Sequence, residues 1–213
     1  CRWVTLTYAE NMTDPKRLYE DFKNFNKRMK YALSKEGHKY EYIVCMEPQG
    51  RGAWHAHLVM IFEEQAPYID NKFMADTWGN GFTVTKKLED VDNVGAYLTA
   101  YLGDMEISEF KNLSEEEQNS MKIFGIKEVE VKGSSEKKSI LKGARLHMYP
   151  PKFNLYRASR GIKKPVVSYE TEKNAQKKVS AGTLTFEKTI ELSDSDSQFS
   201  NTINYRHYNL IRK

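Results

Sequence analysis

The stretch that decides the fold is residues 40–62, which read YEYIVCMEPQGRGAWHAHLVMIF. Its two ends are rich in β-branched and aromatic residues, whereas PQGRG in the middle consists of turn-forming residues. The stretch therefore predicts a β-hairpin with strands over 40–47 and 53–62. On the second strand His55 and His57 are two residues apart, so both imidazoles project from the same face.

The predicted hairpin brings a carboxylate to the two imidazoles. If Glu47 lies opposite Ala53 or His55, it shares their face, because directly opposed residues of paired strands point to the same side. Glu47, His55 and His57 then form a site for Mg²⁺ or Mn²⁺, with open positions for water or phosphate oxygens. Cys45 falls on this face too, so a zinc site of all four residues is an alternative. An ordinary strand with two solvent-facing histidines is the interpretation without chemistry.

A pair of tyrosines lies further along the chain, in the segment DNVGAYLTAYLGD of residues 92–104. Asp92 is a suitable N-cap and Gly103 a suitable end, so the segment predicts a helix on which Tyr97 and Tyr101 share one face. A phenol has a pKa of about 10, so a nearby cation must stabilise the phenolate before it attacks phosphorus. Without such a cation nearby, a tyrosine pair at this spacing is more often half-buried core.

Three motifs in this order resemble those of HUH endonucleases: the strand TLT at 5–7, the phrase EPQGRGAWHAHL at 47–58, and the tyrosine pair. Within that superfamily the chain is most similar to rolling-circle replication initiator (Rep) proteins of bacterial plasmids, phages and integrative elements. The resemblance covers residues 2–104 and extends more loosely to 165. Many relatives carry a Lys beside the tyrosines, where this chain has Ala100. Lys86 or Lys87 is the expected substitute.

The resemblance implies a metal-dependent, site-specific nickase and strand-transferase that acts on single-stranded DNA at a replication origin. Tyr97 is the expected first nucleophile, forming a 5′-phosphotyrosine link and freeing a 3′-OH, and Tyr101 is its partner in a second transesterification. Mn²⁺ or Mg²⁺ at Glu47, His55 and His57 would polarise the scissile phosphate. The sequence contains no P-loop, so a host helicase or a segment outside the sequence is expected to unwind the strands.

Three alternatives remain open at this point. A relaxase or transposase of the same superfamily would use the same chemistry. A non-catalytic nucleic-acid binding module would hold structural zinc. A metal hydrolase would use a bound water, and its products would carry free 5′-phosphates.

Charge is unevenly distributed along the chain. The net charge is +4, but residues 132–178 hold 13 Lys and Arg against three Glu, so the remainder carries a net negative charge. The basic block of residues 145–164 interleaves cations with aromatic rings, as a groove for single-stranded DNA requires. A solvated basic face over an ordinary core is the alternative. The residues predicted to contact DNA are Arg51, Lys86, Lys87, Arg145, Tyr149, Arg157, Arg160, Lys163 and Lys164.

The remaining pattern predicts the fold class. Residues 15–36 predict a helix, since Leu18, Phe22, Phe25, Met29 and Leu33 recur at helical spacing. A second helix is expected near residues 69–78 and a strand at 82–85. The order β-α-β-β-α-β-α predicts an α+β fold, a central antiparallel sheet with helices packed on one face, ferredoxin- or RRM-like as in HUH nucleases. The active site is expected on the open face.

We expect an endonuclease domain over residues 1–165, with an insertion around 105–140, and a C-terminal extension over 166–213. In the extension, 182–192 predict a strand, 193–197 a polar turn and 204–208 a short tail. Two cysteines far apart favour a reducing, cytoplasmic location, and no apolar run approaches the roughly 20 residues of a membrane span. No signal peptide is recognisable, and because the sequence begins at Cys1 without a Met, we expect a segment upstream.

Overall fold

The structure is a computed structural model that describes residues 1–88, 98, 103–130, 137–194 and 199–210. Within it the chain forms two compact units, Cys1–Lys163 and Lys164–Lys213. Each unit is described by itself below.

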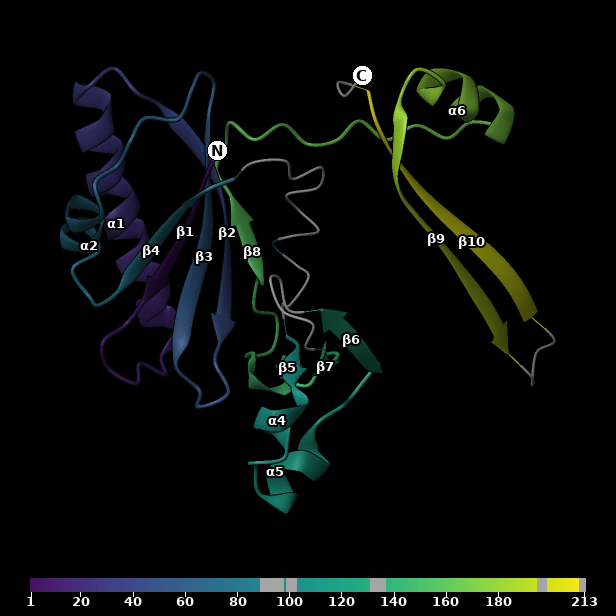
Figure 1. The fold of residues 1–213 in the computed structure, drawn as a ribbon, viewed down its shortest axis with the longest axis horizontal. Helices are drawn as coiled ribbons and strands as arrows, with labels where there is room; N and C mark the ends of the chain where they lie inside the picture. The colour runs from purple at the N-terminus through teal and green to yellow at the C-terminus, as the bar shows by residue number, and fades with distance from the viewer. Residues whose placement is uncertain (89–97, 99–102, 131–136, 195–198, 211–213) are drawn as a thin grey trace. The chain divides into compact units, whose positions relative to one another are not determined.

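The first unit is built on a five-stranded antiparallel sheet with the strand order β4-β1-β3-β2-β8 (Figure 1). The strands are β1 (Arg2–Thr7), β2 (Tyr40–Pro48), β3 (Trp54–Phe62), β4 (Thr83–Lys87) and β8 (Tyr156–Ala158). The predicted hairpin is confirmed, since β2 pairs with β3 and places Glu47 opposite His55. The predicted α+β class is confirmed as well, and the arrangement is consistent with a ferredoxin-like fold.

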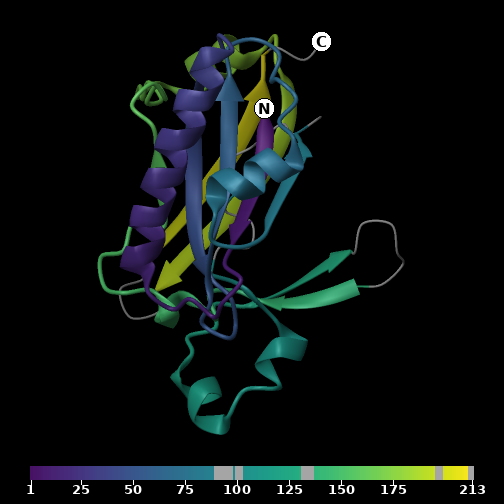
Figure 2. The same ribbon diagram turned by 90° about the vertical axis from the view of Figure 1, so that its left-hand side faces the viewer.

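Two helices, α1 (Pro15–Lys35) and α2 (Asn71–Trp78), cover one face of this sheet (Figure 2). Helix α1 begins at Asp14, whose side chain accepts a hydrogen bond from the Lys16 amide, and Pro15 opens the helix. Helix α2 ends at Gly79, which takes the left-handed conformation at φ 71°. The buried side chains of α1 are the five predicted from its periodicity, Leu18, Phe22, Phe25, Met29 and Leu33. They pack with Val4, Leu6, Val44, Leu58 and Met60 of the sheet.

The opposite face of the sheet carries a second, smaller apolar cluster. Its buried members are Cys45, Val59 and Leu98. Leu98 is the only described residue of the segment 89–102, and the two predicted nucleophiles, Tyr97 and Tyr101, lie outside the described residues. Beyond this cluster, the open face presents the side chains of Glu47, His55 and His57.

The segment between β4 and β8 contains a small sheet of its own, with the strand order β5-β7-β6. It consists of β5 (Met105–Glu106), β6 (Ile126–Glu130) and β7 (Lys137–Leu141), together with the helices α4 (Ile107–Phe110) and α5 (Glu115–Ser120) and the 3₁₀ turn η1 (Leu146–Met148). Met105, Leu141 and Ala144 form its core. Helix α5 begins with a capping box between Ser114 and Glu117, which stabilises this short helix.

The second unit consists of the helix α6 (Glu172–Val179) and a long hairpin of β9 (Thr183–Asp194) and β10 (Phe199–Asn209). The predicted tail at 204–208 is therefore wrong: these residues lie within β10 and pair with β9 along its length, as Ile203 does with Ile190. Polar residues alternate with apolar ones here because only one face of the hairpin meets α6. The predicted polar turn is also shorter than expected at its start, since β9 continues to Asp194.

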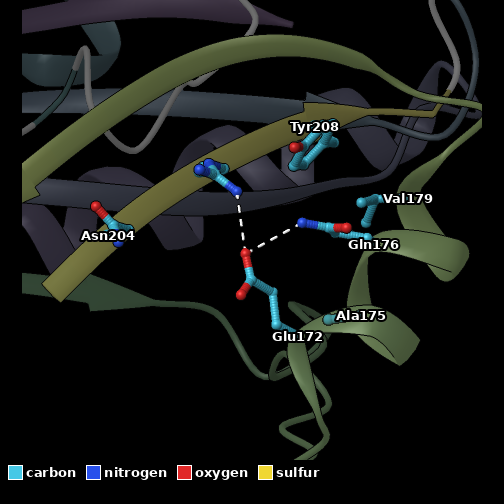
Figure 3. A pocket seen from close by; sticks show the side chains of 7 residues that line it. Glu172, Ala175, Gln176, Val179, Asn204 and Tyr208 are labelled. Atoms are coloured by element: carbon cyan, nitrogen blue, oxygen red, sulfur yellow. Dashed lines mark hydrogen bonds and ion pairs between the residues drawn. The ribbon is translucent and has the colours of Figure 1, made fainter.

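A cavity of about 450 Å³ lies between α6 and β10 (Figure 3). The Glu172 carboxylate accepts a hydrogen bond from Gln176 and lies 3.6 Å from the Arg206 guanidinium. The other lining residues are Ala175, Val179, Asn204 and Tyr208. This polar, ion-paired lining does not include the candidate site.

Candidate metal centre

The ligand atoms of Glu47, His55 and His57 all lie within 4.8 Å of one another on the open face. The two Nε2 atoms are 2.9 Å apart, and each lies 3.8 Å from Oε2 of Glu47. Around an octahedral ion with bonds of about 2.1 Å, neighbouring ligand atoms are separated by about 3 Å, and around tetrahedral zinc by slightly more. The three atoms therefore fit a divalent ion, without selecting which one.

Burial keeps both histidines in the form that binds metals. It lowers the pKa of His55 to about 3 and that of His57 to about 4, so both rings are neutral near pH 7 and each has a free nitrogen lone pair. The Trp3 ring lies against His57, with ring centroids 5.2 Å apart. Because two neutral imidazoles and a carboxylate suit zinc, manganese and magnesium alike, the donor set supports a metal site of undetermined identity.

The two oxygens of the Glu47 carboxylate have different surroundings. Oε2 faces the histidines, whereas Oε1 accepts a hydrogen bond of 3.1 Å from Nη1 of Arg145. Burial raises the pKa of Glu47 to about 7, and the nearby Arg145 opposes this shift. Arg145 was predicted to contact DNA; the structure shows it beside a candidate metal ligand.

Cys45 lies opposite His57 in the β2–β3 register, on the face where the sequence placed it. Its sulfur is not among the grouped ligand atoms in the described part of the chain. Cys45 is buried in the cluster with Val59, and burial raises the pKa of its thiol to about 11, which keeps it protonated. These features favour Glu47 over Cys45 as the third ligand.

The strand registers line up further residues beside the triad. Phe82 and Thr7 exchange backbone hydrogen bonds, and Thr7 lies opposite His55, so Phe82 shares the triad's face. By the same rule, Tyr156 lies opposite Cys45 at the other edge of the sheet. Phe82 is 70% exposed and Tyr156 63%. Sequence reasoning missed both residues, because only the strand order shows that they flank the histidines.

The other residues predicted to bind DNA are spread over several places. Lys86 and Lys87 are exposed on β4, with Lys86 opposite Trp3. The Arg157 guanidinium stacks 3.9 Å from the centre of the Tyr19 ring of α1, and Tyr149 packs on Trp54. The remaining basic residues, Arg51, Arg160, Lys163 and Lys164, are exposed. Of the predicted set, the structure brings only Arg145 into contact with the triad among the described residues.

Comparison with known proteins gives one match. Residues 1–106, just under half of the chain, match the model of a family described as replication-associated protein, ORF2 type. No curated protein and no solved structure matches the chain significantly. In the described residues, no helix combines the length and apolar character needed to cross a membrane. The matched region contains Glu47, His55 and His57, and the match supports a replication-associated, Rep-like protein.

Proposed function

We propose that the chain is a metal-dependent, site-specific nickase and strand-transferase of single-stranded DNA that initiates rolling-circle replication. The observation that carries the proposal is the convergence of Glu47, His55 and His57 on the open sheet face, inside the region that matches a replication-associated family. A divalent ion, Mn²⁺ or Mg²⁺, supplies positive charge to the scissile phosphate when bound there. The HUH resemblance of the three motifs supports the same chemistry.

Tyr97 is the proposed first nucleophile. Its oxygen attacks phosphorus, the bond from phosphorus to the 3′-oxygen breaks, and that oxygen leaves as a 3′-OH after taking up a proton. The 5′-phosphate stays on the tyrosine, and Tyr101 carries out a second transfer of the same type. Leu98, the neighbour of Tyr97 in sequence, packs with Cys45 and Val59 on the face that carries the triad, which supports this assignment.

The open face also offers a path for the strand. Phe82 and Tyr156 flank the triad from the two edges of the sheet, and exposed rings of this kind stack on unpaired bases without regard to sequence. Exposed Lys86 on the same face is suited to a phosphate. We propose that single-stranded origin DNA crosses the sheet between these residues, and that a host helicase separates the strands.

The test is covalent capture of DNA. The full chain is incubated with single-stranded oligonucleotides from the origin region of its genetic element, with Mn²⁺ or with EDTA, and separated under denaturing conditions. We expect a metal-dependent protein–DNA adduct that maps to Tyr97 by mass spectrometry. Tyr97→Phe should abolish this adduct, whereas Tyr68→Phe, a change at a tyrosine that is 81% exposed and distant in sequence, should not.

Two outcomes would contradict the proposal. One is the absence of an adduct with every origin strand. The other is cleavage that leaves free 5′-phosphates and persists in the Tyr97→Phe/Tyr101→Phe double variant, which would indicate a water-using metal hydrolase.

A further inference from the structure

Arg145 joins a candidate metal ligand to a carboxylate outside the triad. Its Nη1 donates to Oε1 of Glu47 at 3.1 Å, and its Nη2 donates to Oε2 of Glu109 at 2.6 Å. The Arg145 side chain is 15% exposed and that of Glu47 8%. Hydrogen bonds between charged groups in such a water-poor site are short and strong, so they fix the orientation of the groups that they join.

This contact determines which oxygen of Glu47 faces the histidines. With Oε1 held by Arg145, Oε2 is the oxygen directed at the two Nε2 atoms, at 3.8 Å from each. Without Arg145, the carboxylate is free to rotate about its last bond, and either oxygen can turn away. Outer partners that orient a ligand in this way typically change metal affinity by about 10–100-fold.

Glu109 solves an electrostatic difficulty in this arrangement. An arginine so close to a divalent cation repels it, and this repulsion is strong where water is scarce. The second prong of Arg145 is paired with Glu109, so the two side chains together are close to neutral. The negative charge of Glu47 is then left for the ion.

The position of Glu109 is itself fixed by the hairpin that carries the triad. Glu109 lies on α4, and its carboxylate contacts the backbone at Gly50, in the turn between β2 and β3. A Cβ atom added to Gly50 would overlap Oε1 of Glu109. The segment that follows β4 therefore meets the metal centre at two points, the turn at Gly50 and the carboxylate of Glu47.

We propose that Arg145 and Glu109 are positioning residues that hold Glu47 in the geometry of a metal ligand. The inference rests on the proposed metal site, but not on the nicking reaction. It assigns to the segment after β4 a role in assembling a site whose ligands all come from the β2–β3 hairpin.

The test measures Mn²⁺ binding to the full chain without DNA, by titration calorimetry and by the electron paramagnetic resonance spectrum of the bound ion. Arg145→Gln separates the two explanations by sign. If Arg145 only contributed repulsive charge, its removal would tighten Mn²⁺ binding; if it positions Glu47, binding weakens, by about 10-fold or more. We expect weakening, with partial recovery in Arg145→Lys, which keeps the charge but lacks the two-pronged geometry.

Two further variants test Glu109. Glu109→Gln is expected to weaken Mn²⁺ binding, whereas Glu106→Gln, the same change in the neighbouring β5 at a residue paired with exposed Lys138, should leave it unchanged. Gly50→Ala leaves every charge in place and displaces the Glu109 carboxylate, so it should weaken binding too. It also serves if Arg145→Gln does not fold, which thermal unfolding of each variant monitors.

Unchanged or tighter Mn²⁺ binding in folded Arg145→Gln, or unchanged binding in both Arg145→Lys and Gly50→Ala, would overturn the inference while leaving the metal site intact. A wild-type chain that binds no Mn²⁺ would overturn both the inference and the metal site. An intact series of Mn²⁺ affinities without any DNA adduct would support the inference and reject only the nickase.

Discussion

Thr5 and His57 lie opposite each other on β1 and β3, and Oγ1 of Thr5 is 3.2 Å from Nδ1 of His57. The same Oγ1 accepts a hydrogen bond from the indole nitrogen of Trp3. A hydroxyl oxygen has two lone pairs, so it can also accept from Nδ1. In that tautomer the proton is on Nδ1 and the Nε2 lone pair is directed toward Glu47 and His55, as metal binding requires. The first strand thus contributes to the site although it supplies no ligand.

Replacing Thr5 by Val should therefore weaken metal binding. Valine has nearly the same shape but cannot accept the Nδ1 proton, so the favoured tautomer of His57 is lost. We expect the dissociation constant for Mn²⁺ to rise by about 10-fold, as is typical for an outer partner of a ligating histidine. Thr7→Val is the matched control, since Thr7 lies on the same strand opposite His55 and its side chain makes no hydrogen bond in the described structure. Equal effects of the two changes would argue against this role of Thr5.

The exposed rings at the two sheet edges lead to a prediction about DNA affinity. Phe82→Ala and Tyr156→Ala should each weaken binding of single-stranded DNA by about 1–3 kcal/mol, because each removes a surface on which a base stacks. The loss should be similar for strands of different sequence and absent for Mn²⁺ binding. Fluorescence anisotropy with labelled oligonucleotides measures it. Tyr68→Ala is the control: a loss as large in this variant would show that the rings act only by general exposure.

The sequence was sufficient to predict the triad because the relevant geometry is local. A hairpin with a short turn fixes which residues oppose one another, and strand alternation then places Glu47, His55 and His57 on one face. The helix α1 was predictable for a similar reason, since its five buried side chains follow the helical period and Asp14 and Pro15 mark its start.

Contacts between distant segments could not be predicted in this way. Arg145 is separated from Glu47 by 98 residues, and only the path of the chain through β5, β7 and β6 brings it back to the site. An arginine in a basic, aromatic-rich segment has the same local pattern whether it contacts a phosphate or a buried carboxylate. Similarly, the strand β8 has three residues, and nothing local in them indicates that Tyr156 pairs beside Cys45.

Metal binding should stabilise the folded chain. An ion that binds only the folded state adds about 2.7 kcal/mol at a concentration 100 times its dissociation constant. For a chain of this size, each kcal/mol raises Tm by about 2–4 °C. We therefore expect Mn²⁺ to raise Tm by several degrees, as measured by differential scanning calorimetry, and EDTA to reverse the shift. His57→Ala should abolish the shift because it removes one of three ligands. A shift that persists in this variant would indicate that the ion binds elsewhere.

The stability of the metal-free chain should depend on pH through the same three residues. In the unfolded chain both histidines take up protons below their ordinary pKa of about 6.5, whereas in the folded chain their pKa values are about 3 and about 4. The unfolded state therefore binds more protons as the pH falls below 6.5, and stability decreases. Glu47 acts in the opposite direction between about pH 7 and 4.5, because its pKa is raised to about 7 in the folded chain. One carboxyl group offsets only part of the effect of two histidines.

The expected result is a Tm that falls as the pH is lowered from 6.5, and falls more steeply below 4.5, where Glu47 no longer offsets the histidines. Each histidine contributes up to about 1.4 kcal/mol per pH unit in this range. The double variant His55→Gln/His57→Gln removes both groups, so its Tm should depend less on pH than that of the wild type. Thermal unfolding in EDTA over pH 4–8 makes the comparison. Parallel curves for the two proteins would mean that the histidines do not resist protonation in the folded state.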